Sequence, residues 1–152
     1  MTPFERWAVW LTSAATVVTG LVYLWMKYLL HSPDPFAVVN HPLQPLFLKL
    51  HILVAPLLVF TLGVILLRHV WRHYRAGMLW GRRSGIATAL FAGPMILTGY
   101  LIQTITHEGW LRAMAWAHIG AGIVYAIGLV LHQVFVRKAM RGIGGVNEEI
   151  RT

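Results

Sequence analysis

Four long apolar segments constrain the fold of this 152-residue chain more than any other feature. A transmembrane helix needs about 20 predominantly apolar residues, and four segments meet that length: residues 7–30, 46–67, 84–106 and 113–136. Charged residues make up 12% of the chain, against about 25% in ordinary soluble domains. Because the connections are short, the sequence predicts an all-α integral membrane protein, a four-helix bundle with up-down topology. We expect residues 1–142 to form a single membrane domain.

The basic residues predict how this bundle is oriented. The connection between the second and third segments holds five arginines, and three more basic residues, Arg137, Lys138 and Arg141, follow the fourth segment. The first connection has neither Lys nor Arg. The positive-inside rule then places both termini in the cytoplasm and the first and third connections in the periplasm, if the membrane is a bacterial inner membrane. We expect residues 143–152 to be a flexible cytoplasmic tail.

The net charge of +8 is therefore attributed to basic residues that set the membrane topology and contact anionic lipid. Nucleic-acid binding is not expected, because membrane spans bound the arginines. The chain has no cysteine, which excludes disulfides, thiolate metal sites, iron–sulfur clusters and covalent haem attachment. Any metal or cofactor would be held by histidine, methionine or oxygen ligands.

Two of the apolar segments carry histidines at helical spacing, although ionisable residues are costly inside a membrane. His118 and His132 are fourteen positions apart, which returns to within about 40° of the same helix face and separates them by roughly 21 Å. His51 and His69 are eighteen positions apart, or five turns, on one face and roughly 27 Å apart. A lone histidine in a span is often only a packing residue, but four in this pattern favour a site.

The second and fourth segments are expected to run in the same direction. His51 and His118 then lie toward the periplasmic side, and His69 and His132 toward the cytoplasmic side. Imidazoles from two facing helices are the ligands of bis-histidine b-type haem, so the pattern predicts two b-type haems. The spacings differ by about 6 Å of helical rise, and His73, one turn beyond His69, is an alternative ligand.

Small and basic residues near these histidines suit the same interpretation. Glycine lets helices or a cofactor approach closely. Gly63 lies between the histidines of the second segment, Gly122 follows His118, and the third segment contains Gly85, Gly93 and Gly99. Arginines in the second connection are expected mainly to set topology, and one or two are candidates to pair with haem propionates: Arg72, Arg75, Arg82 and Arg83.

The H-x13-H spacing of His118 and His132 resembles the cytochrome b subunit of quinol–cytochrome c oxidoreductases. The four-span layout resembles the compact di-haem cytochrome b subunits that anchor bacterial dehydrogenases and hydrogenases. The resemblance implies electron transfer between the quinone pool and a partner redox subunit. Because the chain has no iron–sulfur motif and no soluble domain, we expect that partner to be a periplasmic cytochrome c or an iron–sulfur subunit.

The resemblance also implies a quinone site with proton donors or acceptors. Polar residues in the two predicted periplasmic connections are candidates for quinol docking and proton release: His31, Asp34, His41, His107 and Glu108. A solvated polar loop is the simpler interpretation of the same residues. A cytoplasmic site near His73, Tyr74 and Trp80 is an alternative.

Two other functions compete with electron transfer. A structural membrane subunit would use its histidines to bind polar partners or chlorophyll-like pigments, which usually take one axial histidine each. A metal or proton transporter would be expected to carry acidic residues at mid-membrane, and the four predicted spans contain no Asp or Glu. The paired histidines favour six-coordinate haem over both.

Overall fold

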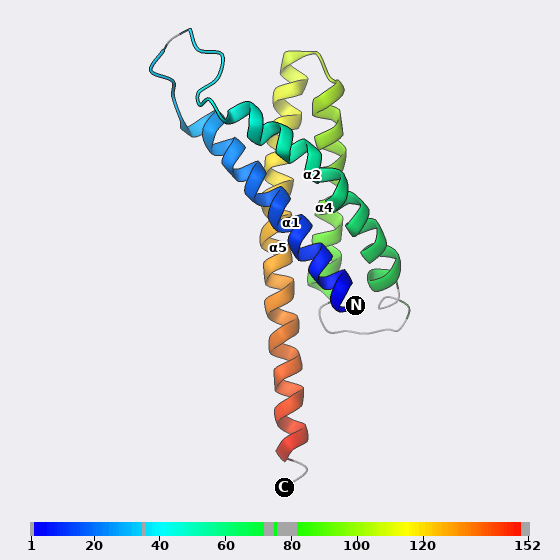
Figure 1. Ribbon diagram of the computed structural model, residues 1–152. Coiled ribbons are helices and arrows are strands. Elements are labelled where there is room, and N and C mark those ends of the chain that lie inside the picture. The colour runs from blue at the N-terminus through cyan, green and yellow to red at the C-terminus, as the bar shows by residue number, and fades with distance from the viewer. Residues whose placement is uncertain (1, 35, 72–74, 76–81, 150–152) are drawn as a thin grey trace. The chain divides into compact units, whose positions relative to one another are not determined.

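The structure is a computed structural model that describes residues 2–34, 36–71, 75 and 82–149, with side chains described outside residues 69–70, 82–84 and 136–149. Every regular element in this part of the chain is a helix (Figure 1). The chain divides into two compact units, residues 1–68 and 69–152. Each unit contains one antiparallel pair of helices, and we call these pairs the first and second hairpins.

The first hairpin pairs α1 (Pro3–Leu24) with α2 (Gln44–Ile65), which lie side by side and are joined by a loop at one end (Figure 1). A capping box fixes the start of α1. The Thr2 hydroxyl accepts a hydrogen bond from the Glu5 backbone N–H at 3.1 Å, and the Glu5 carboxylate accepts one from the Thr2 N–H at 2.9 Å. Two of the otherwise unsatisfied donors at the helix start are thereby bonded.

Both helices of the first hairpin end in a π-helical turn. The turn η1 (Trp25–Leu29) follows α1, and η2 (Leu66–Val70) follows α2 and includes His69. A π-helix bonds i to i+5 and so advances less per residue around the axis than an α-helix. The five-turn count that placed His51 and His69 on one face assumed α-helical geometry throughout, and it does not hold across η2.

The second hairpin pairs α4 (Arg82–Thr104) with α5 (Glu108–Glu149). Its interior is filled by small and medium side chains of α4 around Tyr125 of α5, which is only 1% exposed. The buried residues of α4 are Ala92, Met95 and Thr98. The backbone of α5 remains helical to Glu149, through most of the segment for which we predicted a tail; the flexibility and cytoplasmic location of that tail stay predictions.

The four predicted spans are confirmed as helices long and apolar enough to cross a membrane. Their bounds in the structure are Pro3–Leu29, Gln44–Arg68, Gly85–Thr104 and Glu108–Phe135. Large apolar side chains such as Leu53, Phe60 and Leu90 remain exposed on these helices, at 70%, 74% and 69%, as is expected of surfaces that face lipid. The protein is thus all-helical in its described part and consistent with a multi-pass membrane protein. Assembly of the hairpins into one bundle, and its orientation, stay predictions.

Candidate functional site

His51 of α2 lies against the backbone of α1 at Gly20. A Cβ added to Gly20 would lie 2.9 Å from Cε1 of His51, closer than real Cβ contacts allow. The ring Nδ1 is 3.0 Å from the Thr16 carbonyl oxygen and 3.3 Å from the Thr19 hydroxyl oxygen. The absence of a side chain at Gly20 therefore creates the space that the imidazole occupies, and the two threonine oxygens hold one of its nitrogens.

His118 of α5 is held in the same way against α4. A Cβ on Gly99 would lie 3.0 Å from Cε1 of His118. The ring Nδ1 is 2.8 Å from the Met95 carbonyl oxygen and 3.4 Å from the Thr98 hydroxyl oxygen. Each hairpin thus contains a histidine whose ring edge fits over a glycine of the neighbouring helix.

His132 provides a third example, at the other end of the second hairpin. A Cβ on Gly85 would lie 3.2 Å from Cε1 of His132, and the histidine is half-buried. We call such a place, a glycine with a histidine ring of the neighbouring helix over it, a glycine seat. The described residues contain glycine seats at Gly20, Gly85 and Gly99.

Two of the seats, Gly85 and Gly99, are among the glycines that the sequence analysis named, whereas Gly63 and Gly122 are not seats. A Cβ on Gly63 would meet nothing within 4 Å, and one on Gly122 would lie 3.9 Å from the Met95 sulfur. Gly20 and the threonines beside the rings were missed by sequence reasoning. The repeated dipeptide Thr–Gly, at residues 19–20 and 98–99, is the signal that could have found them.

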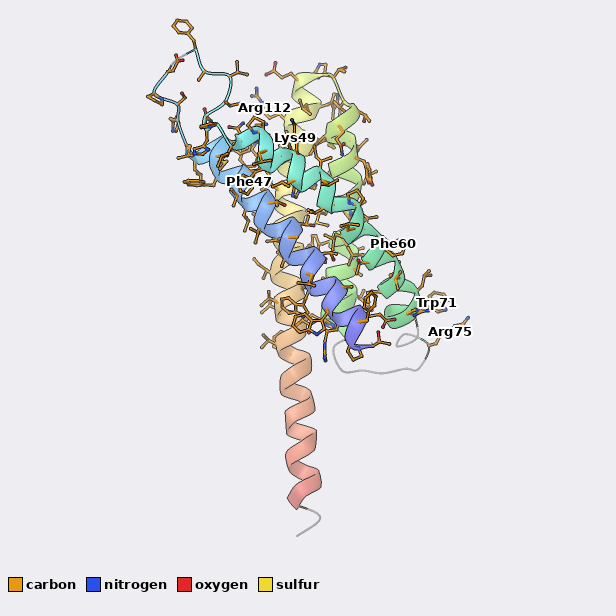
Figure 2. The ribbon with its side chains drawn as sticks, in the orientation of Figure 1. Phe47, Lys49, Phe60, Trp71, Arg75 and Arg112 are labelled. Carbon is orange, nitrogen blue, oxygen red and sulfur yellow. The ribbon has the colours of Figure 1, made fainter. Side chains whose placement is uncertain are left out.

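Part of the predicted cytoplasmic site lies outside the described side chains, namely His69, His73, Arg72, Arg82 and Arg83. Arg75 is described, and its guanidinium lies over the ring of Trp71 at 5.2 Å from the centroid (Figure 2). A guanidinium on an indole face is a favourable cation–π contact. Pairing of any of these arginines with a propionate stays a prediction.

The far end of the first hairpin carries an ion pair instead of a glycine seat. The Arg68 guanidinium lies 3.3 Å from the Glu5 carboxylate. Glu5 is 9% exposed, whereas the Arg68 side chain is 68% exposed. Glu5 precedes the predicted first span and was not considered as a site residue. Its carboxylate belongs to the capping box at the start of α1 and, through this ion pair, connects α1 to η2, the turn that follows α2.

The predicted quinone residues all lie near the helix connections, and four of them make local bonds. In the first loop the Asp34 carboxylate accepts from the Phe36 N–H at 2.9 Å, and His41 Nδ1 accepts from the Leu43 N–H at 3.1 Å; His31 is exposed. At the start of α5, His107 Nδ1 accepts from Trp110 N–H at 3.5 Å, and Glu108 pairs with Arg112 at 2.9 Å. His31, Asp34 and His41 thus belong to the first hairpin, and His107 and Glu108 belong to the second.

Over the residues whose positions are described, no group of three or more His, Asp or Glu side chains converges as a metal site would. Comparisons of the chain with protein-family models, with curated proteins and with solved structures found no match.

Proposed function

We propose that the chain is the membrane subunit of a quinone-linked redox complex and binds b-type haem through its intramembrane histidines. The observation that carries this proposal is the glycine seat, because three histidines in apolar helices each lie over a glycine of the neighbouring helix. Each of these glycines leaves the space that the imidazole of the neighbouring helix occupies. A ligand histidine needs a fixed ring, and these seats fix one.

The hydrogen bonds of two seats suit an iron ligand. A backbone carbonyl can only accept, so His51 Nδ1 donates to the Thr16 carbonyl and His118 Nδ1 to the Met95 carbonyl. The lone pair is then on Nε2, the nitrogen that binds metal in a neutral imidazole. A second ring nitrogen donating to a carbonyl is the usual support of a metal-bound histidine. This donor set, without thiolates, fits a non-covalently held haem.

Haem, when bound, supplies one-electron transfer. This chain's part is to supply ligands at two levels, for which the assignments remain those made from the sequence: His51 with His118, and His69 or His73 with His132. We propose that these ligand pairs would hold two b-type haems, which would supply electron transfer between quinone and a periplasmic cytochrome c or iron–sulfur partner subunit. Arginines of the second connection are the proposed partners of the propionates.

We further propose that the protein resides in a bacterial inner membrane with both termini in the cytoplasm, because the arginines concentrate in the second connection. The cysteine-free chain allows a direct test. A single cysteine at Val38 should react with an impermeant maleimide added from the periplasmic side, whereas one at Met78 should not. The reverse labelling would invert the assignment.

The quinone site is proposed at the first and third connections. If His31→Ala, His41→Ala and Glu108→Gln all leave quinol-dependent reduction unchanged, quinol does not react there. The bonds of Asp34, His41, His107 and Glu108 to neighbours in their own loops and helix starts also suit purely local roles, so each variant is first checked for an unchanged thermal midpoint.

A structural subunit, with or without a bound pigment, is the second candidate. The same hydrogen bonds of His51 and His118 favour it, because polar side chains bonded across helices stabilise membrane bundles by themselves. A reduced-minus-oxidised spectrum of the purified protein, with a pyridine haemochrome titration, separates the candidates. A b-type α-band with about two haems per chain supports electron transfer. A folded preparation from its native host without haem excludes that function and favours the structural subunit.

A further inference from the structure

One arrangement of hydrogen bonds occurs twice in the chain, once in each hairpin. In the first hairpin it is built from Thr16, Thr19 and Gly20, and in the second from Met95, Thr98 and Gly99. The order is the same in both: a carbonyl, a threonine hydroxyl three residues later, and a glycine immediately after. All three groups contact one histidine ring of the facing helix.

The direction of each hydrogen bond follows from the partners of the hydroxyls. The Thr19 hydroxyl donates its proton to the Ala15 carbonyl at 2.7 Å, and the Thr98 hydroxyl donates to the Pro94 carbonyl at 2.6 Å. Each hydroxyl has one proton, so its oxygen meets the histidine Nδ1 as an acceptor. The Nδ1 proton is thus shared between two acceptors, the carbonyl and the hydroxyl.

Two acceptors do more than one for the orientation of a ring. With the carbonyl alone, the imidazole can pivot about the line from Nδ1 to the carbonyl oxygen. The hydroxyl oxygen, 3.3 Å from Nδ1 in His51 and 3.4 Å in His118, removes part of that freedom. The glycine leaves room for Cε1 on the same side, so the ring plane is defined by three contacts from one helix.

We infer that Thr19 and Thr98 are positioning residues that hold His51 and His118 in the Nδ1-protonated tautomer and in a fixed ring plane, with Nε2 as the basic nitrogen. The tautomer and ring plane are properties of the protein alone. The consequence for ligand strength rests on the proposed function, because partners of a metal-bound histidine tune its affinity for the metal.

The test uses the full-length protein in detergent with ¹⁵N-labelled histidine, reduced with dithionite. Signals are assigned with His51→Gln and His118→Gln. Thr19→Val should shift only the Nδ1–H signal of His51 toward a weaker hydrogen bond, and Thr98→Val only that of His118. Thr19→Ser and Thr98→Ser should restore each signal. Thr12→Val is the matched control, because Thr12 lies in α1 and donates to the carbonyl four residues before it, at 2.7 Å.

Bound haem should be lost about tenfold more readily in each valine variant. Protonation at Nε2, or shifts no larger than those of Thr12→Val, would overturn the inference. If the tautomers and shifts are as expected but the protein binds no haem, the positioning role stands and the proposed function fails. If haem binds through His51 and His118 but valine changes neither shift nor affinity, the function stands and the positioning role fails.

Discussion

Each hairpin, taken by itself, has the same arrangement at one of its ends and a different one at its other end. In both, a histidine lies over a glycine that follows a threonine, with Nδ1 bonded to a carbonyl: His51 in the first and His118 in the second. At the opposite end, the second hairpin has His132 over Gly85, whereas the first has the Glu5–Arg68 ion pair.

The spacing of residues explains this difference. Gly85 lies fourteen positions before Gly99, and His132 lies fourteen positions after His118. Equal spacing on two antiparallel helices brings a second glycine and a second histidine to the same height. In the first hairpin the corresponding positions hold Arg6 and Ile65, so neither half of a second seat exists there. The ligand proposed to pair with His132 therefore lies beyond α2, at His69 in η2 or at His73.

The largest expected effects come from removing His51 of the first hairpin or His118 of the second, which have equivalent seats. Because a six-coordinate haem needs both of its ligands, the proposed pairing predicts that His51→Leu and His118→Leu each lower bound haem by about one per chain. His132→Leu should remove the other haem. The pyridine haemochrome of purified protein, divided by protein concentration, measures this.

A matched comparison keeps this experiment interpretable. Each variant should retain the helical circular dichroism of the unsubstituted protein. If His118→Leu loses haem while an equally folded His51→Leu retains all of it, His51 and His118 are not ligands of the same haem.

Filling the seats should have the next largest effect. Gly20→Ala and Gly99→Ala would place a Cβ 2.9 and 3.0 Å from a histidine ring, and Gly85→Ala one 3.2 Å away. Overpacking of this kind costs about 1–3 kcal/mol, so we expect lower thermal midpoints, with Gly20 and Gly99 affected more than Gly85.

Gly93→Ala is the control for the seats. It lies in α4 like Gly99, but its Cβ would meet nothing within 4 Å. Thermal unfolding in detergent, followed by circular dichroism, compares the four variants. Equal thermal midpoints for Gly93→Ala and Gly99→Ala would mean that the space beside the His118 ring at Gly99 does not contribute to stability.

Much of this fold could be predicted from the sequence, because membrane spans depend on length and apolar composition. All four spans were predicted, and the ends agree to within five residues. The π-helical turn at Leu66–Val70 was not predicted, since no residue type specifies it. The pairing of each histidine with its glycine was missed for a different reason. The repeated Thr–Gly dipeptide marks Gly20 and Gly99 in the sequence, but the histidine that each glycine faces lies on another helix and follows only from the pairing of the helices.

A smaller effect is expected at the end where the hairpins differ. Thr2→Ala removes the hydroxyl that accepts the Glu5 N–H, and loss of such a cap costs about 1 kcal/mol. The thermal midpoint should fall, while the haem content should not change because the glycine seats are untouched. Loss of haem in Thr2→Ala would instead show that haem binding depends on the helix cap at this end of the first hairpin.

The smallest effect should come from the start of α5, which allows a last comparison of the two connections. Glu108 and Arg112 form an exposed i,i+4 pair, with side chains 83% and 72% exposed, and such pairs contribute about 0.2–0.5 kcal/mol. Glu108→Gln should therefore leave the thermal midpoint almost unchanged. Its rate of quinol-dependent reduction, measured beside that of His41→Ala in the first loop, then reports on chemistry alone. A slower rate in both variants would support a quinol site that draws on both connections, and a slower rate in only one would assign the site to that connection.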